Sequence, residues 1–490
     1  MRRATLAVSI AAALALPPTT AAQSTIHGNA SARAALERAL DAMGGSARLA
    51  SLGATRRRWT LETRDAWQGL RPVPRDSAPV LEHAEGSWIH DPAARRALIL
   101  EQGTIFGGQP YARRRALSDA GGFFVQDSVR RIDSLSARSA TAALASLERQ
   151  LPETLLAQAW DRRHRLQALP GPADQDRVAY ATDDGTQLVI AFDRGTGLPL
   201  MQEQMADHAA LGDYAYRIRY DDWRQVGPVR LPFRHTEEWV SGSRVRTMHE
   251  VVAGIPPAQT VLDAPAGYAA APGTSAEATT LSPGVHLFSG AYNSLLVEFA
   301  DYVVVVEPAA GTRAAARVMS EAARLAPGKP IRYVVATHFH DDHLAGIRPY
   351  IAAGATVLTT PHGAGAVREI AAVRKGMFPD TLDLAPREPR VEGILRRRVL
   401  QDATQRLEIL ETGPSPHAEQ MLVVWLPRAG VLYEGDLLDL DVAEDGAPMP
   451  GDDTRTFGAW LDRAGLPVRI IVPTHGRPGS PADLRRALAR

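Results

Sequence analysis

The amino-acid sequence predicts an α/β protein with two separate domains, and three observations support this. In the last third of the chain, short apolar runs such as Ile331 to Ala336 are followed directly by histidine or aspartate. In the first half, a helical pattern precedes a series of strand-like runs. Residues 256–280 are rich in Pro, Ala, Gly and Thr and lack periodicity, which is typical of a linker. We therefore expect an N-terminal α+β domain at 30–255 and a second domain at 281–490.

Residues 1–22 have the pattern of a secretory signal peptide. Arg2 and Arg3 precede the apolar run Ala4 to Ala15, and small residues precede Gln23. The apolar run is too short to span a membrane, which disfavours a cytoplasmic protein with a membrane anchor. The chain has no cysteine, so neither disulfides nor a lipid-bearing cysteine can form. The sequence thus predicts a periplasmic or secreted protein without an integral membrane segment in the mature chain.

The segment after the signal peptide begins with a helix and continues as antiparallel strands. A helix is expected from Ser31 to Met43, and Gly44-Gly45 would end it. The remaining expected elements are a hairpin of 177–182 and 187–192 around Asp183-Asp184-Gly185, strands at 214–220, 230–239 and 244–252, and a helical stretch at 141–160. This order resembles the curved sheet of periplasmic lipoprotein carriers. The alternative is a structural or dimerising domain that shapes the mouth of an active site.

The most informative stretch is His338-Phe339-His340-Asp341-Asp342-His343, directly after a predicted buried strand. Imidazole and carboxylate groups suit Zn(II). Alternation along the chain lets His338 and His340 address one metal while Asp342 and His343 address another. A single metal would not need all four ligands.

The stretch from Thr337 to Gly346 resembles the metallo-β-lactamase superfamily, whose motif is Thr-His-x-His-x-Asp-His followed by a small residue and Gly. Further candidates occur in the family's order: His417 in Gly-Pro-Ser-Pro-His, Asp436 after a short strand that ends at Tyr433, and His475 after an apolar run. The resemblance implies a four-layer αβ/βα sandwich for 281–490.

The resemblance also implies a role for each candidate. One metal would be bound by His338, His340 and His417, the other by Asp342, His343 and His475, with Asp436 bridging the two. Asp342 would also be the catalytic residue that orients the attacking water. Glu307 stands where most of the superfamily has Asp, and its expected role is to support the ligand loop from behind. The implied cofactor is two Zn(II) ions per chain, with iron or manganese as alternatives.

Two zinc ions lower the pKa of a bound water to roughly 7, which provides hydroxide without a separate base. We therefore expect an exported, zinc-dependent hydrolase of a carboxylic ester, lactone or amide, β-lactams included. No cation lies close to Asp436 in the sequence to hold a lactam carboxylate, although Arg428 or Arg477 could do so. The alternative function is a periplasmic binding or carrier protein with a largely structural metal domain.

The expected partner is a small-molecule substrate, and a homodimer is a further possibility. The formal net charge is +0 and no basic block stands out, which argues against nucleic acid. His286 and His362 are expected to be structural or to lie at the edge of a pocket. Residues 363–400 are longer than a simple connection requires, so we expect a helix and loop inserted near the metal site, or else a surface excursion.

Overall fold

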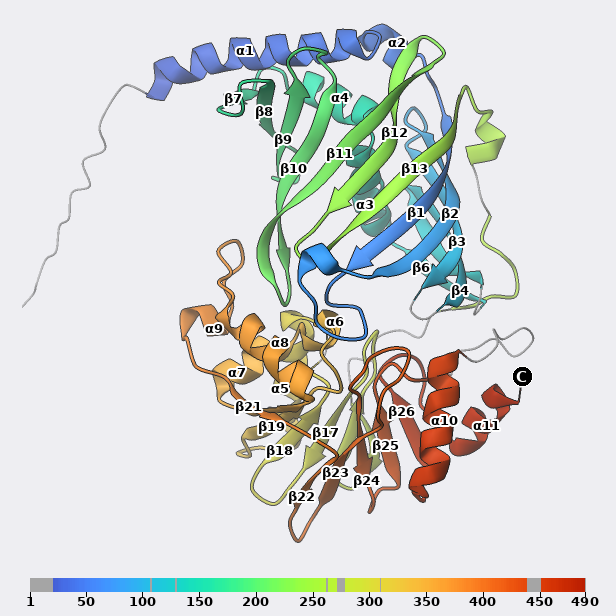
Figure 1. Ribbon diagram of the computed structural model, residues 1–490, viewed down its shortest axis with the longest axis vertical. Helices are drawn as coiled ribbons and strands as arrows, with labels where there is room; N and C mark the ends of the chain where they lie inside the picture. Colours follow the sequence, from blue (N-terminus) through green and yellow to red (C-terminus); the bar gives the residue numbers. More distant parts are fainter. Residues whose placement is uncertain are drawn as a thin grey trace, which may run out of the picture.

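The computed structural model describes residues 21–105, 108–127, 130–260, 263–270, 278–308, 310–438 and 451–489. A large curved sheet with its helices stands end-on upon a second body of two sheets and flanking helices (Figure 1). The predicted fold class is confirmed by this arrangement. The predicted signal peptide lies almost entirely outside the described residues. Among the described helices, none combines the length and the apolar character needed to cross a membrane.

Within the described chain, the N-terminal sheet has 14 strands in the order β14-β6-β5-β4-β3-β2-β1-β13-β12-β11-β10-β9-β8-β7. Their bounds are β1 (Thr55–Asp65), β2 (Val80–Asp91), β3 (Arg96–Ile105), β4 (Gln109–Ser118), β5 (Gly121–Gln126), β6 (Arg131–Leu135), β7 (Gln167–Leu169), β8 (Gln175–Ala181), β9 (Gln187–Asp193), β10 (Pro199–His208), β11 (Gly212–Val226), β12 (Val229–Glu238), β13 (Gly242–Ala253) and β14 (Ala269–Ala270). The pairings are antiparallel except that of β14 with β6. The predicted hairpin is confirmed as β8 and β9.

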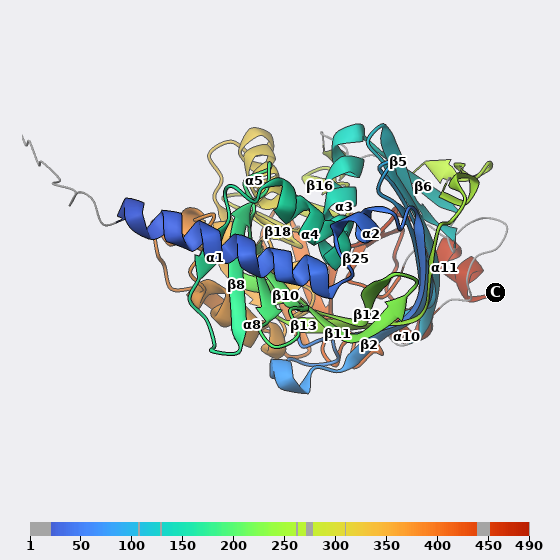
Figure 2. The same ribbon diagram turned by 90° about the horizontal axis from the view of Figure 1, so that it is seen from above.

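The helices of this domain are α1 (Ala21–Ala42), α2 (Ser46–Ala50), α3 (Ala137–Gln150) and α4 (Pro152–Asp161). Helix α1 lies across one end of the sheet, and α3 and α4 lie on its inner, concave side (Figure 2). Alternate residues of β1 are buried on this side, so the sheet has one covered face. The prediction of one helix at 141–160 was wrong in detail. Pro152 has no N–H for a continuous helix, and it starts α4 instead.

The C-terminal domain packs two sheets face to face. The first contains β15 (Thr279–Ser282), β16 (Val285–Phe288), β17 (Ser294–Glu298), β18 (Val303–Val306), β19 (Ile331–Val335), β20 (Thr356–Thr359) and β21 (Arg390–Gly393), in that order. The second contains β22 (Arg397–Gln401), β23 (Arg406–Glu411), β24 (Leu422–Leu426), β25 (Val431–Glu434) and β26 (Ile470–Pro473). Their facing sides form one buried aliphatic layer, in which Val297 and Val424 have no exposed surface.

Helices cover the outer face of each sheet and complete four layers. On the first sheet lie α5 (Thr312–Leu325), α7 (Ile347–Ala353) and α8 (Pro361–Ala372), with the short helices α6 (Asp341–Leu344) and α9 (Thr381–Leu384) nearby. On the second lie α10 (Asp452–Ala464) and α11 (Pro481–Leu488). Residues 363–400 contain the predicted helix and loop but also β21 and β22, which extend the two sheets. Their polar, Arg-rich sequences conceal that strand character.

The loop between α8 and β21 is anchored by one buried arginine. Arg348, only 1% exposed, donates to Asp380 through Nε at 2.6 Å and Nη2 at 3.1 Å, and to the carbonyl oxygens of Ile370 and Val373 at 2.9 and 2.8 Å. Its charge and its donors are thus matched without water, so the loop has a fixed path.

Two segments of the N-terminal domain reach the C-terminal domain. The hairpin of β10 and β11 contacts the anchored loop, where Asp213 Oδ2 accepts from the backbone N of Gly376 at 2.7 Å and of Met377 at 2.8 Å, and Asp207 pairs with Lys375 at 3.0 Å. The connection from β1 to β2, residues 66–79, descends toward α6 (Figure 1). We call it the capping loop.

Candidate metal centre

The predicted ligands converge at the edge of the sandwich that faces the N-terminal domain (Figure 1). His338 and His340 follow β19, while Asp342 and His343 belong to α6. The other three lie in the connections that precede β24 or follow β25 and β26: His417, Asp436 and His475. Strands in both sheets end at this edge, so residues far apart in sequence meet there.

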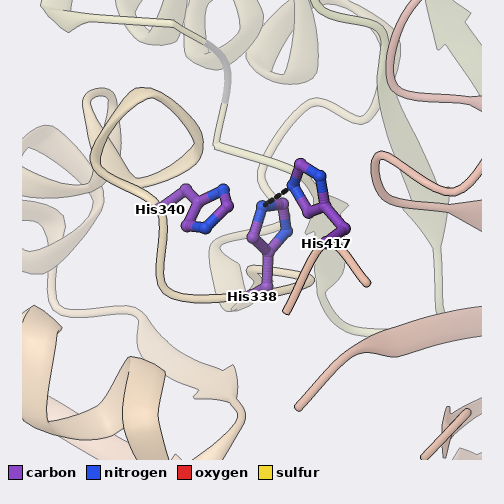
Figure 3. Close-up of side chains that lie close together, drawn as sticks. All are labelled: His338, His340 and His417. Carbon is purple, nitrogen blue, oxygen red and sulfur yellow. Dashed lines mark hydrogen bonds between the residues drawn. The ribbon is translucent and has the colours of Figure 1, made fainter. Parts of the chain in front are cut away.

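The first cluster contains His338, His340 and His417, whose rings approach one another from two loops (Figure 3). Their ligand atoms lie within 4.8 Å of one another, and Nε2 of His338 is 3.2 Å from Nε2 of His417. All three side chains are buried. The Nδ1 atom of His340 is buried without a hydrogen-bond partner among the described residues. An unpaired buried nitrogen among imidazoles fits a transition-metal ligand.

The second cluster contains Asp342, His343, Asp436 and His475, again with ligand atoms within 4.8 Å of one another. Asp436 Oδ2 lies 3.0 Å from Nε2 of His343, and Oδ1 lies 3.4 Å from Nε2 of His475. Asp436 Oδ2 is also 3.5 Å from Nε2 of His417 in the first cluster. The Asp436 carboxylate therefore lies between the two groups, where a shared ligand would be.

Outer contacts hold several of these imidazoles through the ring nitrogen that points away from the cluster. Thr337 Oγ1 lies 3.0 Å from Nδ1 of His338 and donates to Glu307 Oε2 at 2.8 Å. Oε1 of the same carboxylate lies 3.4 Å from Nδ1 of His343. The carbonyl oxygen of Ala291 lies 2.8 Å from Nδ1 of His475. The contacts with Thr337 and Ala291 fix the orientation and tautomer of His338 and His475 and leave the inner nitrogen of each ring for a metal.

Glu307 lies close to both clusters, through Thr337 beside His338 and directly beside His343. Glu307 has no exposed surface and directly follows β18. Its backbone φ is +65°, a conformation that is costly for any residue other than glycine. Its backbone N–H donates to Val335 at 2.8 Å, which ties the turn to β19. The longer Glu side chain reaches the Thr337 hydroxyl and His343 from a position where most of the superfamily is expected to have Asp.

The electrostatics of the two clusters differ. Burial is the main reason that the pKa values of His338, His340 and His417 are lowered, to about 3 for His417. Imidazoles that stay neutral at pH 7 keep a lone pair for a metal. In the second cluster, burial opposes the charge on His343, but Asp436 and Asp342 overcome it and raise the pKa of this imidazole. The carboxylates of Asp342 and Asp436 thus favour a positive charge between them.

The capping loop supplies groups that sequence reasoning missed. Gln68 Nε2 donates to Asp341 Oδ1 at 2.5 Å and to Asp342 Oδ1 at 2.7 Å. The carbonyl oxygen of Gly69 lies 2.9 Å from Nε2 of His340, so it can hold that nitrogen's proton and leave Nδ1 facing the cluster. These residues lie some 270 positions before the ligands, and no local pattern marks a glutamine or a backbone carbonyl as part of a site.

Tyr292 and Asn293 support the site from the other side. The Tyr292 hydroxyl donates to Asp342 Oδ2 at 2.7 Å, and its ring centroid is 4.5 Å from that of His475. Asn293 Nδ2 donates to the carbonyl oxygens of Pro473 and Gly476, each at 2.8 Å, which fixes the loop that carries His475. Neither residue is among the site residues predicted from the sequence.

The two arginines considered as holders of a substrate carboxylate occupy different places. Arg428 lies in the turn between β24 and β25, at the end of these strands remote from the ligands, and donates to the carbonyl oxygen of Ala403 at 2.8 Å. That suggestion was wrong, because the turn reverses the chain away from the site. Arg477 is two residues from His475 and pairs with Asp483 at 3.8 Å.

His286 bonds with Thr280 and Glu298, as a structural histidine would.

The C-terminal half of the chain is similar to known proteins. Residues 289–475 match the model of the metallo-beta-lactamase superfamily. Similar solved structures include a metallo-beta-lactamase from Pontibacter korlensis, with 22% identity, 44% of this chain and 97% of that chain covered, and a TM-score of 0.35. Another is the metallo-beta-lactamase FIM-1 from Pseudomonas aeruginosa in its mono-zinc form, with 20% identity, 44% and 93% coverage, and a TM-score of 0.34.

The fold and the family match define a metal-dependent hydrolase. The C-terminal domain of this chain belongs to the metallo-β-lactamase superfamily.

Substitution of Glu307 by Gln is expected to weaken zinc binding by about 10- to 100-fold, because the contact with His343 would lose its negative charge. Competition with a chromogenic chelator measures this affinity. Glu298→Gln is the matched control, since Glu298 lies on β17 and bonds with His286 and Lys329 instead. Equal zinc affinities for the two variants would contradict the role of Glu307.

Substitution of Gln68 by Ala is expected to lower zinc affinity by about tenfold, since Asp341 and Asp342 lose a shared donor while Gly69 remains. The same chelator competition applies, with circular dichroism to verify folding. Gln102→Ala is a suitable control, because Gln102 donates to Glu85 on the exposed face of the N-terminal sheet. If both variants bind zinc as the unaltered chain does, the capping loop does not support the site.

Proposed function

We propose that this chain is an exported dinuclear zinc hydrolase of a carboxylic ester, lactone or amide, β-lactams included. The observation that carries the proposal is the position of Asp436, whose carboxylate oxygens lie 3.0 to 3.5 Å from histidines of both clusters. A carboxylate shared between two sets of imidazoles is the arrangement that two neighbouring metal ions require.

The donor set fits zinc. His338, His340 and His417 would hold one ion, and Asp342, His343 and His475 the other, with Asp436 shared. Nitrogen and oxygen donors without cysteine suit Zn(II), while iron or manganese are alternatives. Bound zinc supplies Lewis acidity and lowers the pKa of a water molecule to about 7.

Asp342 is positioned as the residue that orients the attacking water and accepts its proton. Its Oδ2 accepts from the Tyr292 hydroxyl and its Oδ1 from Gln68, each at 2.7 Å, so the carboxylate cannot rotate freely. Although burial opposes ionisation, the imidazole of His343 lowers the pKa of Asp342, which keeps it a proton acceptor at neutral pH. Fixed geometry and an ionised state are both needed for that role.

The surroundings of the site bear on the order of the candidate substrates. Leu70 of the capping loop is 53% exposed. Its carbonyl oxygen accepts a hydrogen bond from the backbone N of Glu419 at 2.8 Å. After the exclusion of Arg428, Arg477 is the candidate left to bind a β-lactam carboxylate, and it already forms an ion pair with Asp483. Ester and lactone substrates, which need no such cation, are therefore placed before β-lactams.

The remaining parts of the proposal concern organisation and location. Residues 1–22 would direct export to the periplasm or the medium, 30–255 would form the domain that caps the site, 256–280 would link the domains, and 281–490 would be catalytic. A small-molecule substrate is the proposed partner. Nucleic acid is disfavoured by the net charge of +0, and a homodimer remains open.

The test is zinc content by elemental analysis together with hydrolysis of lactones, aryl esters, phosphodiesters and a chromogenic cephalosporin. We expect about two zinc ions per chain and turnover of one carboxylic class. Asp342→Asn should abolish most turnover, by about 10³-fold or more, while the chain stays folded, because the water loses its oriented acceptor. Asp161→Asn, at an exposed position of α4, is the matched control and should keep full activity.

The carrier alternative predicts a different pattern. Little zinc, no turnover of any substrate and no effect of Asp342→Asn on ligand retention would overturn the hydrolase. Turnover confined to phosphodiesters would keep the metal site but refute the carboxylic substrate class.

A further inference from the structure

The concave face of the N-terminal sheet contains a cavity of about 360 Å³ that the proposed hydrolase does not use. It lies between β2 to β5, the ends of β12 and β13, and one side of α3. We call it the arginine pocket, because five arginines line it from neighbouring strands: Arg113, Arg114, Arg115, Arg244 and Arg246. Its volume suits a ligand the size of a small aromatic molecule.

Carboxylates balance most but not all of this positive charge. Arg246 Nη1 lies 2.9 Å from Glu237, Arg244 Nη2 lies 3.5 Å from Glu82, and Arg113 Nη1 lies 3.9 Å from Glu101. The fifth arginine, Arg114, forms an ion pair with Asp127 and is thereby neutralised. The other four guanidinium groups against three carboxylates leave a charge of +1 in the cavity.

The unmatched charge belongs to Arg115 on β4. Within the described residues its guanidinium makes no ion pair, and its recorded contact is with the ring of Phe124, 5.3 Å from the ring centroid. Arg115 is an exposed residue at the cavity; partial burial of its guanidinium lowers its pKa, and the charges of Arg113 and Arg244 lower it further, against the opposing effect of Glu101. In addition, Nε of the buried Arg246 has no hydrogen-bond partner in the described chain. An anion in this cavity would relieve the repulsion and satisfy a donor.

The remaining walls are apolar and partly aromatic. Phe124 and Trp88 contribute ring surface from the sheet, and Leu147 and Ala143 contribute aliphatic surface from α3. Trp88 is itself fixed by the Arg246 guanidinium, 4.0 Å from its ring centroid. The pocket thus combines one unmatched cation with flat apolar surface. A purely aliphatic chain would leave the charged groups desolvated, which disfavours the lipid cargo of a carrier.

We propose that the arginine pocket binds an organic monoanion, in which a carboxylate or sulfonate meets Arg115 and a flat apolar body lies against Phe124, Trp88 and α3. The site goes beyond the proposed hydrolase and does not depend on it. Arg115 is on β4, three positions from β1 in the sheet order, while the candidate metal ligands belong to the other domain.

The test is a fluorescence titration of the full-length, zinc-loaded protein with the aromatic sulfonate 8-anilinonaphthalene-1-sulfonate. We expect saturable binding to the unaltered chain and a dissociation constant raised by about tenfold or more in Arg115→Gln, which removes a charge-assisted hydrogen bond. Arg219→Gln is the matched control, because Arg219 is an exposed residue of β11 that pairs with Glu238. It should bind the probe like the unaltered chain.

A second variant makes the test independent of how Arg115→Gln folds. Ser146 is an exposed residue of α3 that lines the pocket, so Ser146→Glu adds a negative charge and should also weaken binding by about tenfold. Hydrolysis should be unchanged in both variants, since neither residue contacts the metal centre.

A competition experiment separates the charged group from general apolar binding. Naphthalene-2-carboxylate should displace the probe, whereas the neutral naphthalene-2-carboxamide should not. The proposal is overturned by absence of saturable binding to the unaltered chain, by unchanged affinity in both variants, or by equal displacement with the amide.

Discussion

The architecture of the C-terminal domain depends on holding buried imidazoles by one ring nitrogen so that the other faces a common space. A buried imidazole whose inner nitrogen has no partner is unfavourable, and several such rings together also repel any proton. The chain accepts this cost at His340, whose inner Nδ1 has no hydrogen-bond partner among the described residues, and burial keeps the pKa values of His338, His340 and His417 low. Thr337, Glu307, Ala291 and Gly69 fix rings of the two clusters from behind. The four-layer sandwich brings these groups to one edge.

The centre is completed by the N-terminal domain rather than by the sandwich alone. The capping loop contributes Gln68 and Gly69, which contact Asp341, Asp342 and His340 directly. The hairpin of β10 and β11 contacts the loop that Arg348 anchors. Two separate segments therefore fix the position of one domain on the other. The large sheet determines where the capping loop lies, and this loop brings the first half of the chain into contact with the candidate site of the second.

Much of the ligand arrangement could be predicted from the sequence because the ligands are encoded locally. His338 to His343 adjoin one strand, and the remaining ligands adjoin other short apolar strands, so proximity follows from strand ends meeting at one edge. The contributions of Gln68 and Gly69 could not be predicted, since they depend on the path of a loop from a different domain. Tyr292 was missed because a tyrosine carries no motif. The break at Pro152 was predictable from the missing N–H, whereas β21 and β22 were concealed by charged residues that the sheet edge tolerates.

The most direct test of the central claim is anomalous diffraction at the zinc edge from crystals of the zinc-loaded protein. The account predicts two anomalous peaks on either side of the Asp436 carboxylate, one bound by Nδ1 of His340 with His338 and His417, and one bound by Asp342, His343 and His475. A single peak, or a peak coordinated through Nε2 of His340 with Gly69 displaced, would contradict it.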